Sequence, residues 1–282
     1  MEISNENLQE IEKNILNIED ELYEYYTDEE LYRIMELTKN KAVFLKCMEN
    51  VYIPYLIEKV KNPETSKEMI LKLTAHPKGM IQLPILARED TTTQTLKLLL
   101  ENFKEEKNKP NRHVIINHTK MDEQTLYELT DCDNNEILSL IILSDKVSPR
   151  ILEKLKQNKD EKISTMAKVR DPKTDQEYIK KVIKKEIPKT IKEKGDYINK
   201  YFPEHESLLI NDVLEAAIKN PKLSSELIDL YKGFCKTAVL TLIIQHPNIS
   251  QKKLDAYYRL GDDDVKEAVI KFREKKNNIE KI

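Results

Sequence analysis

Hydrophobic and polar positions repeat along most of this chain. In the stretch Asn62–Leu73, a polar turn containing Pro63 leads to Ser66, and apolar residues follow four and seven positions later, at Ile70 and Leu73. The same order of turn, capping residue and apolar pair returns six more times. The residues at the capping position are Ser66, Thr92, Asp122, Ser148, Asp175, Ser224 and Ser250.

Each part of this pattern predicts a feature of a helix. Ser, Thr and Asp at a helix N-terminus accept a hydrogen bond from an amide of the first turn. Residues four and seven positions later share one face, so every copy predicts a helix with a narrow apolar stripe that must pack on a neighbour. Prolines three residues before four of the caps oppose continuation of the preceding helix. They are Pro63, Pro172, Pro221 and Pro247.

A second, more uniformly apolar helix is expected between successive capped helices. Pro84 lies inside one of these stretches and predicts a short helical turn that begins near Leu83. Gly195, Gly233 and Gly261 stand where helices are expected to end. The apolar stretches cover residues 80–87, 114–116, 137–143, 163–169, 208–218, 238–244 and 265–272.

The spacing of the caps is regular except at one place. Successive caps are 26, 30, 26, 27, 49 and 26 residues apart. The step of 49 residues lies between Asp175 and Ser224, where a Lys-rich segment near residues 176–205 is inserted. The sequence therefore predicts a stack of helix-turn-helix units with one degenerate unit or insertion.

The N-terminal region follows a different period. Its apolar residues alternate steps of three and four, which is heptad spacing. Ser4 is expected to cap this helix, with Ile3 packing on Leu8. Because the pattern is short, we expect a capping helix packed on the repeats rather than a coiled-coil dimer. Elements near residues 28–47 and 54–60 follow it. The heptad positions are Leu8, Ile11, Ile15, Ile18, Leu22 and Tyr25.

Composition agrees with an all-α chain. Of its 282 residues, 39% are hydrophobic, only four are Gly and none is Trp. The abundance of Leu, Lys and Glu favours helices over strands. We therefore expect an N-terminal acidic helical cap over residues 1–58, a repeat region over residues 59–275 and a polar tail over residues 276–282.

Three phrases carry a resemblance to a known family. The segments 62–65 (Asn-Pro-Glu-Thr), 171–174 (Asp-Pro-Lys-Thr) and 261–269 resemble units of the leucine-rich repeat variant family, a HEAT-like group. The similarity covers roughly residues 60–270. It implies an α-solenoid, which is a superhelical stack of helix pairs. Members of this family chiefly bind other molecules. Some members carry an iron-sulfur module, but this chain lacks the clustered cysteines that such a module needs.

Charge is unevenly distributed along the chain. The net charge is −3, which provides no global basic field for a nucleic acid. Residues 1–36 have a balance of −10, whereas residues 173–200 have a balance of +4. Charge runs of this kind are usually solvated helix faces. Contact of the lysines in residues 173–200 with nucleic-acid phosphates nevertheless stays an alternative.

The cysteines and histidines do not form a recognisable catalytic or metal motif. Cys47, Cys132 and Cys235 are far apart, so we expect neither a disulfide framework nor a zinc site. His118 and His246 occupy the same repeat position, where polar side chains satisfy backbone groups of a turn. We predict no metal and no cofactor.

Two further segments resemble metal-binding motifs but lack residues that those motifs need. After His205-Glu206, Leu209 replaces the second His of a zinc-protease helix. Asp131, Asp133 and Asn135 have the spacing of a calcium loop, but the turn Gly and closing Glu are missing, so a helix start is expected. The absence of a signal peptide or long apolar run favours a cytoplasmic, non-membrane protein.

These observations favour a non-enzymatic protein-interaction scaffold or adaptor. We expect it to be a monomer rather than a dimer. One alternative is a nucleic-acid-engaging HEAT-like protein of the DNA glycosylase kind. Another is an inhibitor whose acidic, Tyr-containing N-terminus (Tyr23, Tyr25, Tyr26 and Tyr32) occupies a basic groove. Candidate partner-binding residues lie on the capped helices outside the apolar stripe: Gln124, Glu128, Arg150, Glu153, Lys180, Lys181, Glu226 and Lys252.

Overall fold

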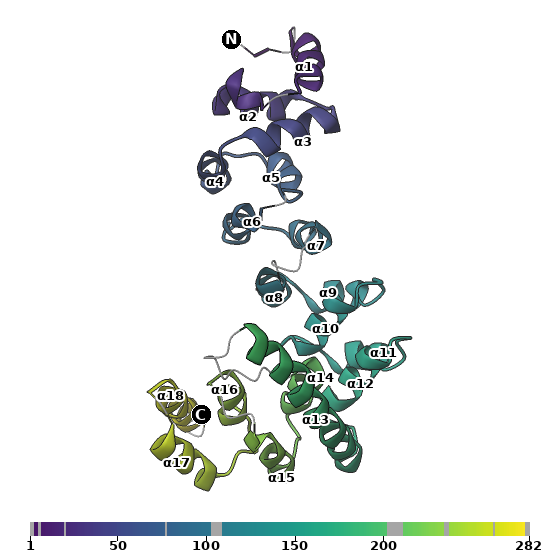
Figure 1. Ribbon diagram of the computed structural model, residues 1–282, viewed down its shortest axis with the longest axis vertical. Helices are drawn as coiled ribbons and strands as arrows, with labels where there is room; N and C mark the ends of the chain where they lie inside the picture. The colour runs from purple at the N-terminus through teal and green to yellow at the C-terminus, as the bar shows by residue number, and fades with distance from the viewer. Residues whose placement is uncertain are drawn as a thin grey trace. The chain divides into compact units, whose positions relative to one another are not determined.

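The computed structural model describes residues 3–4, 7–19, 21–76, 78–102, 109–201, 211–233, 237–261 and 263–279. In these residues all regular secondary structure is helical and no strand is present (Figure 1). The all-α prediction is thereby confirmed. The chain divides into two compact units, residues 1–125 and 126–282, and the boundary falls within one helix, α9. The predicted boundaries at residues 58 and 275 stay predictions.

The first unit contains short helices joined by tight turns. Its elements are α1 (Leu8–Asn17), the 3-10 turn η1 (Leu22–Glu24), α2 (Asp28–Leu37), α3 (Lys41–Asn50), α4 (Ile53–Lys61), α5 (Lys67–Leu73), α6 (Gly79–Leu86), α7 (Thr93–Asn102), α8 (Lys109–Asn117) and the start of α9 (Glu123–Leu129). Helix α6 packs against α4 and α8, while α5 packs against α7. Helices two apart in sequence therefore pack on each other in this unit.

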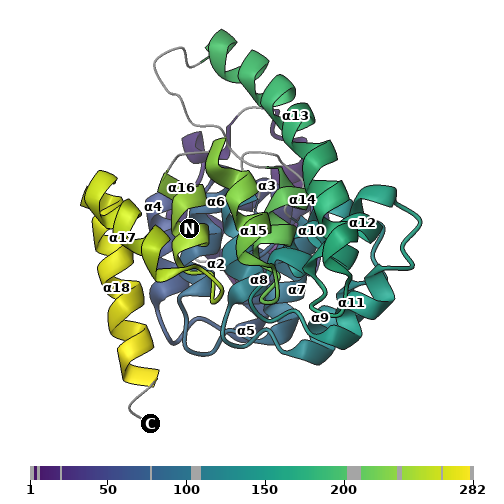
Figure 2. The same ribbon diagram turned by 90° about the horizontal axis from the view of Figure 1, so that it is seen from below.

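The second unit follows the same scheme with one long helix added. Its elements are the end of α9, then α10 (Asn135–Leu143), α11 (Pro149–Leu155), α12 (Glu161–Arg170), α13 (Gln176–Tyr201), α14 (Asp212–Ile218), α15 (Ser225–Ile228), the 3-10 turn η3 (Asp229–Gly233), α16 (Thr237–Ile244), α17 (Gln251–Leu260) and α18 (Asp263–Ile279). Helix α12 packs against α10, α11, α13 and α14. Helix α18 packs against α16 and α17, which Figure 2 shows at one edge.

All seven predicted capping residues accept a hydrogen bond from the amide three residues later. Ser66 accepts from Met69 at 3.2 Å, and Asp122 accepts from Thr125 at 2.7 Å. Thr92, Ser148, Asp175, Ser224 and Ser250 do the same. The helix starts are therefore determined by local hydrogen bonding, as the sequence predicts.

The apolar stripe of the capped helices is also confirmed. The residues four positions after each cap are all buried: Ile70, Leu96, Leu126, Leu152, Ile179, Ile228 and Leu254. Seven positions after the cap, Leu129, Val182 and Tyr257 are only half-buried, whereas the other four residues are buried. The core of the second unit is thus built mainly from this stripe and from the apolar helices that alternate with it, whereas the core of the first unit also contains many buried residues of α1–α4.

The turns before these helices share one hydrogen-bonding arrangement. The His246 Nδ1 accepts from the amide of Asn248 at 3.1 Å, and its Nε2 lies 2.8 Å from the carbonyl oxygen of Asn220. His118 contacts the Lys120 amide and the Leu86 carbonyl in the same way. The predicted turn role of both histidines is confirmed. Side-chain oxygens of Asn62, Asp171 and Asn220 likewise accept from the amide two residues later.

The N-terminal region differs from its predicted form. Helix α1 ends at Asn17, so Leu22 and Tyr25 do not continue it. Ser4 is not the N-cap residue, because Asn7 occupies that position and its Oδ1 accepts hydrogen bonds from the amide and hydroxyl of Ser4. Beyond α1, the Leu22 amide of η1 donates a hydrogen bond to Asn50 Oδ1 on α3. The region expected over residues 28–47 is two helices, α2 and α3.

Two predictions based on Pro and Gly are wrong. Helix α6 begins at Gly79 and contains Pro84, so Pro84 does not delay its start to Leu83. Helix α13 continues through Gly195 to Tyr201. In contrast, Gly261 is the C-cap residue of α17 and Gly233 ends η3. His205 and Cys235 lie outside the described residues.

Candidate partner-binding surface

The structure places the eight predicted binding residues on five capped helices. Seven of the side chains are exposed, and Lys180 is half-buried. Gln124 and Glu128 lie on α9, although the unit boundary falls between them. The others lie in the second unit: Arg150 and Glu153 on α11, Lys180 and Lys181 on α13, Glu226 on α15 and Lys252 on α17.

Helices α9 and α11 bring part of this set together. The guanidinium carbon of Arg150 lies 3.8 Å from the centre of the Tyr127 ring, and the Lys154 Nζ lies 4.3 Å from the same centre. Lys154 also pairs with Asp131 at 2.7 Å. Two cations of α11 therefore contact one aromatic ring of α9, an arrangement that cation–π attraction favours. We call the exposed side of α9 and α11, with Glu128, Arg150 and Glu153, the α9–α11 face.

Later capped helices are linked to one another in chain order. The Gln176 Oε1 at the start of α13 accepts from the Ser224 amide at 2.9 Å. The Lys253 Nζ on α17 donates to the Ser225 carbonyl at 2.9 Å and pairs with Asp229. Lys156, which follows α11, pairs with Asp171 in the turn before α13. The remaining candidates are thus spread along successive helices rather than gathered at one point.

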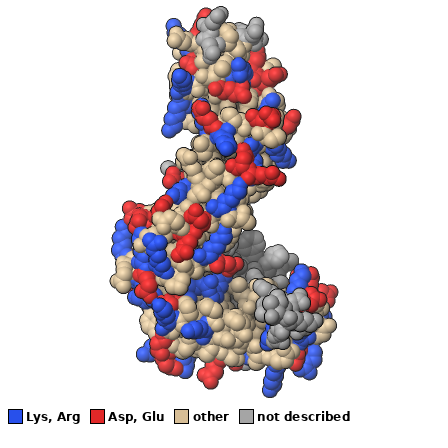
Figure 3. Space-filling model, turned by 180° about the vertical axis from the view of Figure 1, so that it is seen from behind, with Lys and Arg blue, Asp and Glu red and all other residues tan. Residues whose placement is uncertain are grey.

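The electrostatic character of these helices is mixed. Lys180 pairs with Glu177 at 3.4 Å, and Lys156 pairs with Glu153 at 2.8 Å. On the face drawn in Figure 3, basic and acidic side chains are interspersed and do not form one area of a single sign. A surface of this kind favours a partner with complementary charges of both signs over a polyanion.

Sequence reasoning missed Tyr127 and Lys154 as members of the α9–α11 face. Tyr127 is five residues after the cap Asp122, next to the buried stripe, and is half-buried. Its contact with Arg150 depends on how α11 packs against α9, which the repeat pattern alone does not define. The signal available in the sequence was the aromatic residue itself, at a position where α11 and α13 have charged residues.

The Lys-rich insertion is the body of α13. Lys181, Lys184 and Lys185 are exposed on this helix. Its other side is tied to the core, because Glu186 is buried and accepts a hydrogen bond from Asn211 at 2.8 Å. Figure 2 shows the helix extending beyond α12 and α14, its neighbours in the second unit. The exposed lysines therefore form one basic stripe on an otherwise mixed surface.

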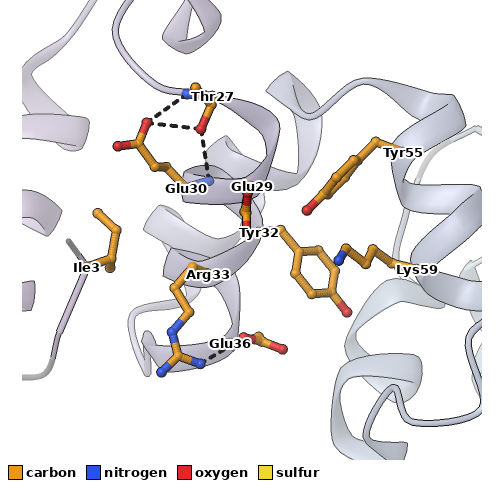
Figure 4. A pocket seen from close by; sticks show the side chains of 9 residues that line it. All are labelled: Ile3, Thr27, Glu29, Glu30, Tyr32, Arg33, Glu36, Tyr55 and Lys59. Carbon is orange, nitrogen blue, oxygen red and sulfur yellow. Dashed lines mark hydrogen bonds and ion pairs between the residues drawn. The ribbon is translucent and has the colours of Figure 1, made fainter. Parts of the chain in front are cut away.

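A tyrosine-lined cavity of about 430 Å³ lies beside α2 in the first unit (Figure 4). The rings of Tyr32 and Tyr55 meet edge to face, with centroids 6.1 Å apart. The Lys59 ammonium lies 5.5 Å from the centre of the Tyr32 ring and 5.0 Å from that of Tyr55. This lysine already occupies the position that a cationic ligand would take between the rings.

Several polar and ionisable groups of this cavity are paired with one another. Arg33 pairs with Glu36 at 2.9 Å, and Glu30 completes a capping box with Thr27. A hydrogen bond with Tyr55 raises the pKa of Lys59, while burial raises the pKa of Tyr32. Lys59 is therefore charged and Tyr32 neutral near pH 7, and the contacts of Lys59 with the two rings join α4 to α2. Because Tyr32 is buried, it is not part of an exposed N-terminal tyrosine surface.

Other chemical features are few among the side chains of the part of the chain that the structure describes. These described residues contain no cluster of three or more His, Cys, Asp or Glu side chains arranged to hold a metal ion. Cys47 and Cys132 are free thiols, and burial raises the pKa of Cys47 to about 12. None of the described helices is long and apolar enough to span a membrane. Comparison with known proteins found no matching family model, curated protein or solved structure.

Proposed function

We propose that this chain is a non-enzymatic α-solenoid scaffold that binds a protein partner along its capped helices. The resemblance of its repeats to leucine-rich repeat variant and HEAT-like proteins supports this function. The observation that carries it is the chain-order linkage of exposed, mixed-charge helices in the second unit, from α9 to α11 and from α13 to α17. Stacked helix pairs of this type form extended surfaces suited to another macromolecule.

The α9–α11 face is the proposed centre of binding. Arg150 is exposed and its guanidinium rests on Tyr127, which places a cation at the surface where a partner carboxylate would bind. Arginine and tyrosine are enriched among residues that contribute most to protein interfaces. Glu128 and Glu153 supply carboxylates beside these groups. The face therefore offers both signs of charge around an aromatic ring.

Nucleic-acid binding is the second candidate, and the exposed lysines of α13 are the observation that favours it. A protein that neutralises several phosphates loses affinity steeply as salt increases. Lys181, Lys184 and Lys185 would carry such binding, whereas Glu128 and Glu153 would oppose it. Charge reversals on the two surfaces therefore distinguish the two functions.

The test is affinity capture from the native lysate on the full chain, with and without nuclease. The binding variant is Glu128→Lys with Arg150→Glu, and the matched control is Glu274→Lys with Lys276→Glu on α18. We expect a protein retained by the wild-type chain and by the control, lost with the binding variant and unaffected by nuclease. Retention that depends on nucleic acid, or is equal in all three chains, would contradict the proposal.

A further inference from the structure

An apolar groove lies on three alternate helices of the first unit. It lies among α3, α5 and α7 and has a volume of about 470 Å³. Phe44 lines it and is buried, with the Lys72 Nζ 5.7 Å from the centre of its ring, and Leu45, Leu71 and Leu98 are half-buried along it. This volume falls within the roughly 300–1,000 Å³ of ligand-binding pockets.

The repeat pattern does not account for the two leucines on α5 and α7. The core stripe of α5 is formed by Ile70 and Leu73, which are buried, whereas Leu71 is the intervening residue five positions after the cap. Leu98 lies six positions after its own cap. At these two positions α11 has Glu153 and Lys154. Apolar side chains thus replace charged ones where the helix faces outward, and interaction sites are marked by such contiguous apolar surface.

The rim of the groove is basic. Lys39, Lys41 and Lys72 line it, and Glu68 is the one acidic residue among the described lining residues. The Lys72 Nζ lies 2.9 Å from Glu68, and the pKa of Glu68 is lowered by this hydrogen bond and by the charges of Lys72 and Lys39. The negative charge of Glu68 is therefore already matched, and Lys39 and Lys41 are exposed.

We propose that this groove binds an acidic peptide segment of a protein partner. Large apolar side chains of the segment pack against Leu45, Leu71 and Leu98, beside the Phe44 ring that the Lys72 ammonium covers. Flanking carboxylates face Lys39 and Lys41, because charge complementarity sets the orientation of a bound chain. This site rests on the proposed function only in requiring a protein partner. Its residues are different from those of the α9–α11 face.

The test selects ligands without assuming their sequence. A library of random peptides displayed on phage is selected on the full wild-type chain and counter-selected on Leu71→Gln with Leu98→Gln. The matched control is Leu83→Gln, since Leu83 is an exposed leucine on α6 outside the groove. Circular dichroism verifies that each variant is folded. The affinity of the selected peptides is then measured by fluorescence anisotropy.

We expect enriched peptides that are acidic and carry two or more large apolar residues. Their binding should weaken at least about tenfold in Lys39→Glu with Lys41→Glu, whose exposed positions leave the core unchanged. Basic or purely polar peptides, or none that separate wild type from the leucine variant, would overturn the proposal. A wild-type dimer lost in the leucine variant would instead assign the groove to a second copy. Peptide binding that survives Glu128→Lys with Arg150→Glu establishes the groove even if the α9–α11 face fails.

Discussion

The Arg150 guanidinium carbon lies 3.8 Å from the centre of the Tyr127 ring, which joins two consecutive capped helices through an exposed cation and a half-buried aromatic residue. The contact holds the arginine against a protein surface while leaving it accessible to solvent. An arginine held in this way loses less side-chain entropy when it binds a carboxylate. The pair therefore combines stabilisation of the α9–α11 packing with preorganisation of a binding group.

The apolar stripe predicts a large difference between buried and surface substitutions on the same helices. Leu126→Ala and Leu152→Ala should each lower the free energy of unfolding by about 2–5 kcal/mol, since both side chains are buried. Lys154→Ala removes an ion pair and a contact with Tyr127, which is a cost of about 1 kcal/mol or less. Urea unfolding followed by circular dichroism measures all three. Equal effects would show that the stripe is misplaced.

The buried turn histidine His76 predicts a pH dependence of stability. Burial lowers its pKa from 6.5 to about 4, while the nearby Met48 carbonyl acts in the opposite direction. As the pH falls below 6.5, the unfolded chain takes up a proton before the folded chain does. The stability that this group contributes is therefore complete above pH 6.5 and is lost progressively toward pH 4, by up to about 3 kcal/mol.

A substitution isolates this contribution from the titration of carboxylates. His76→Asn retains an acceptor for the Lys78 amide, because Asn62 and Asn220 perform the same role in other turns. The variant should lose less stability than the wild type between pH 6.5 and pH 4 in urea unfolding experiments. Parallel curves for the two proteins would contradict the assigned cause.

Gly261 is required by close packing between α17 and α18. A Cβ at this position would lie 2.4 Å from Val265 Cγ1 and 2.6 Å from the Tyr257 carbonyl oxygen. We expect Gly261→Ala to destabilise the chain by about 1–3 kcal/mol, as overpacked substitutions do. Thermal unfolding of Gly261→Ala, Val265→Ala and the double variant tests this. Strict additivity would argue against a clash with Val265.

The N-terminal helix is predicted to cover apolar surface of the first unit. Ile11, Ile15 and Leu22 are buried, and Lys46 on α3 donates to the Ile18 carbonyl. Deletion of residues 5–26 should lower both solubility and the melting temperature, because a terminal repeat otherwise exposes its apolar side. A truncated chain with unchanged melting temperature and solubility would show that this segment is not a cap.

The predictable parts of the structure are those determined by nearby residues in the chain. A cap such as Ser66 bonds three residues away, and Asn220 bonds an amide two residues away, so short sequence patterns identify both. Pro84 misled because α6 packs against α4 and α8, which outweighs the local cost of a proline inside the helix. Gly195 misled because a glycine costs a helix interior only about 1 kcal/mol and does not by itself end α13. The packing of neighbouring helices is not encoded in a local pattern.

The same distinction applies to the candidate sites. The exposure of Arg150 and Glu153 follows from their position outside the helix stripe. The contact of Arg150 with Tyr127 depends on how α11 packs near α9. In the same way, Leu71 and Leu98 meet in one groove only because α5 packs on α7. Sequence periodicity identifies the exposed residues, whereas the packing determines which of them meet.

The most direct test of protein binding by this chain is a titration by biolayer interferometry at physiological salt. The immobilised full chain is titrated with the protein recovered by affinity capture, and separately with duplex DNA and with structured RNA. We predict saturable binding of the protein that weakens at least about tenfold in Glu128→Lys with Arg150→Glu, with weak binding of either nucleic acid. Nanomolar binding of DNA or RNA that is unchanged in that variant but lost on reversing Lys181, Lys184 and Lys185, with no protein partner recovered, would contradict the account.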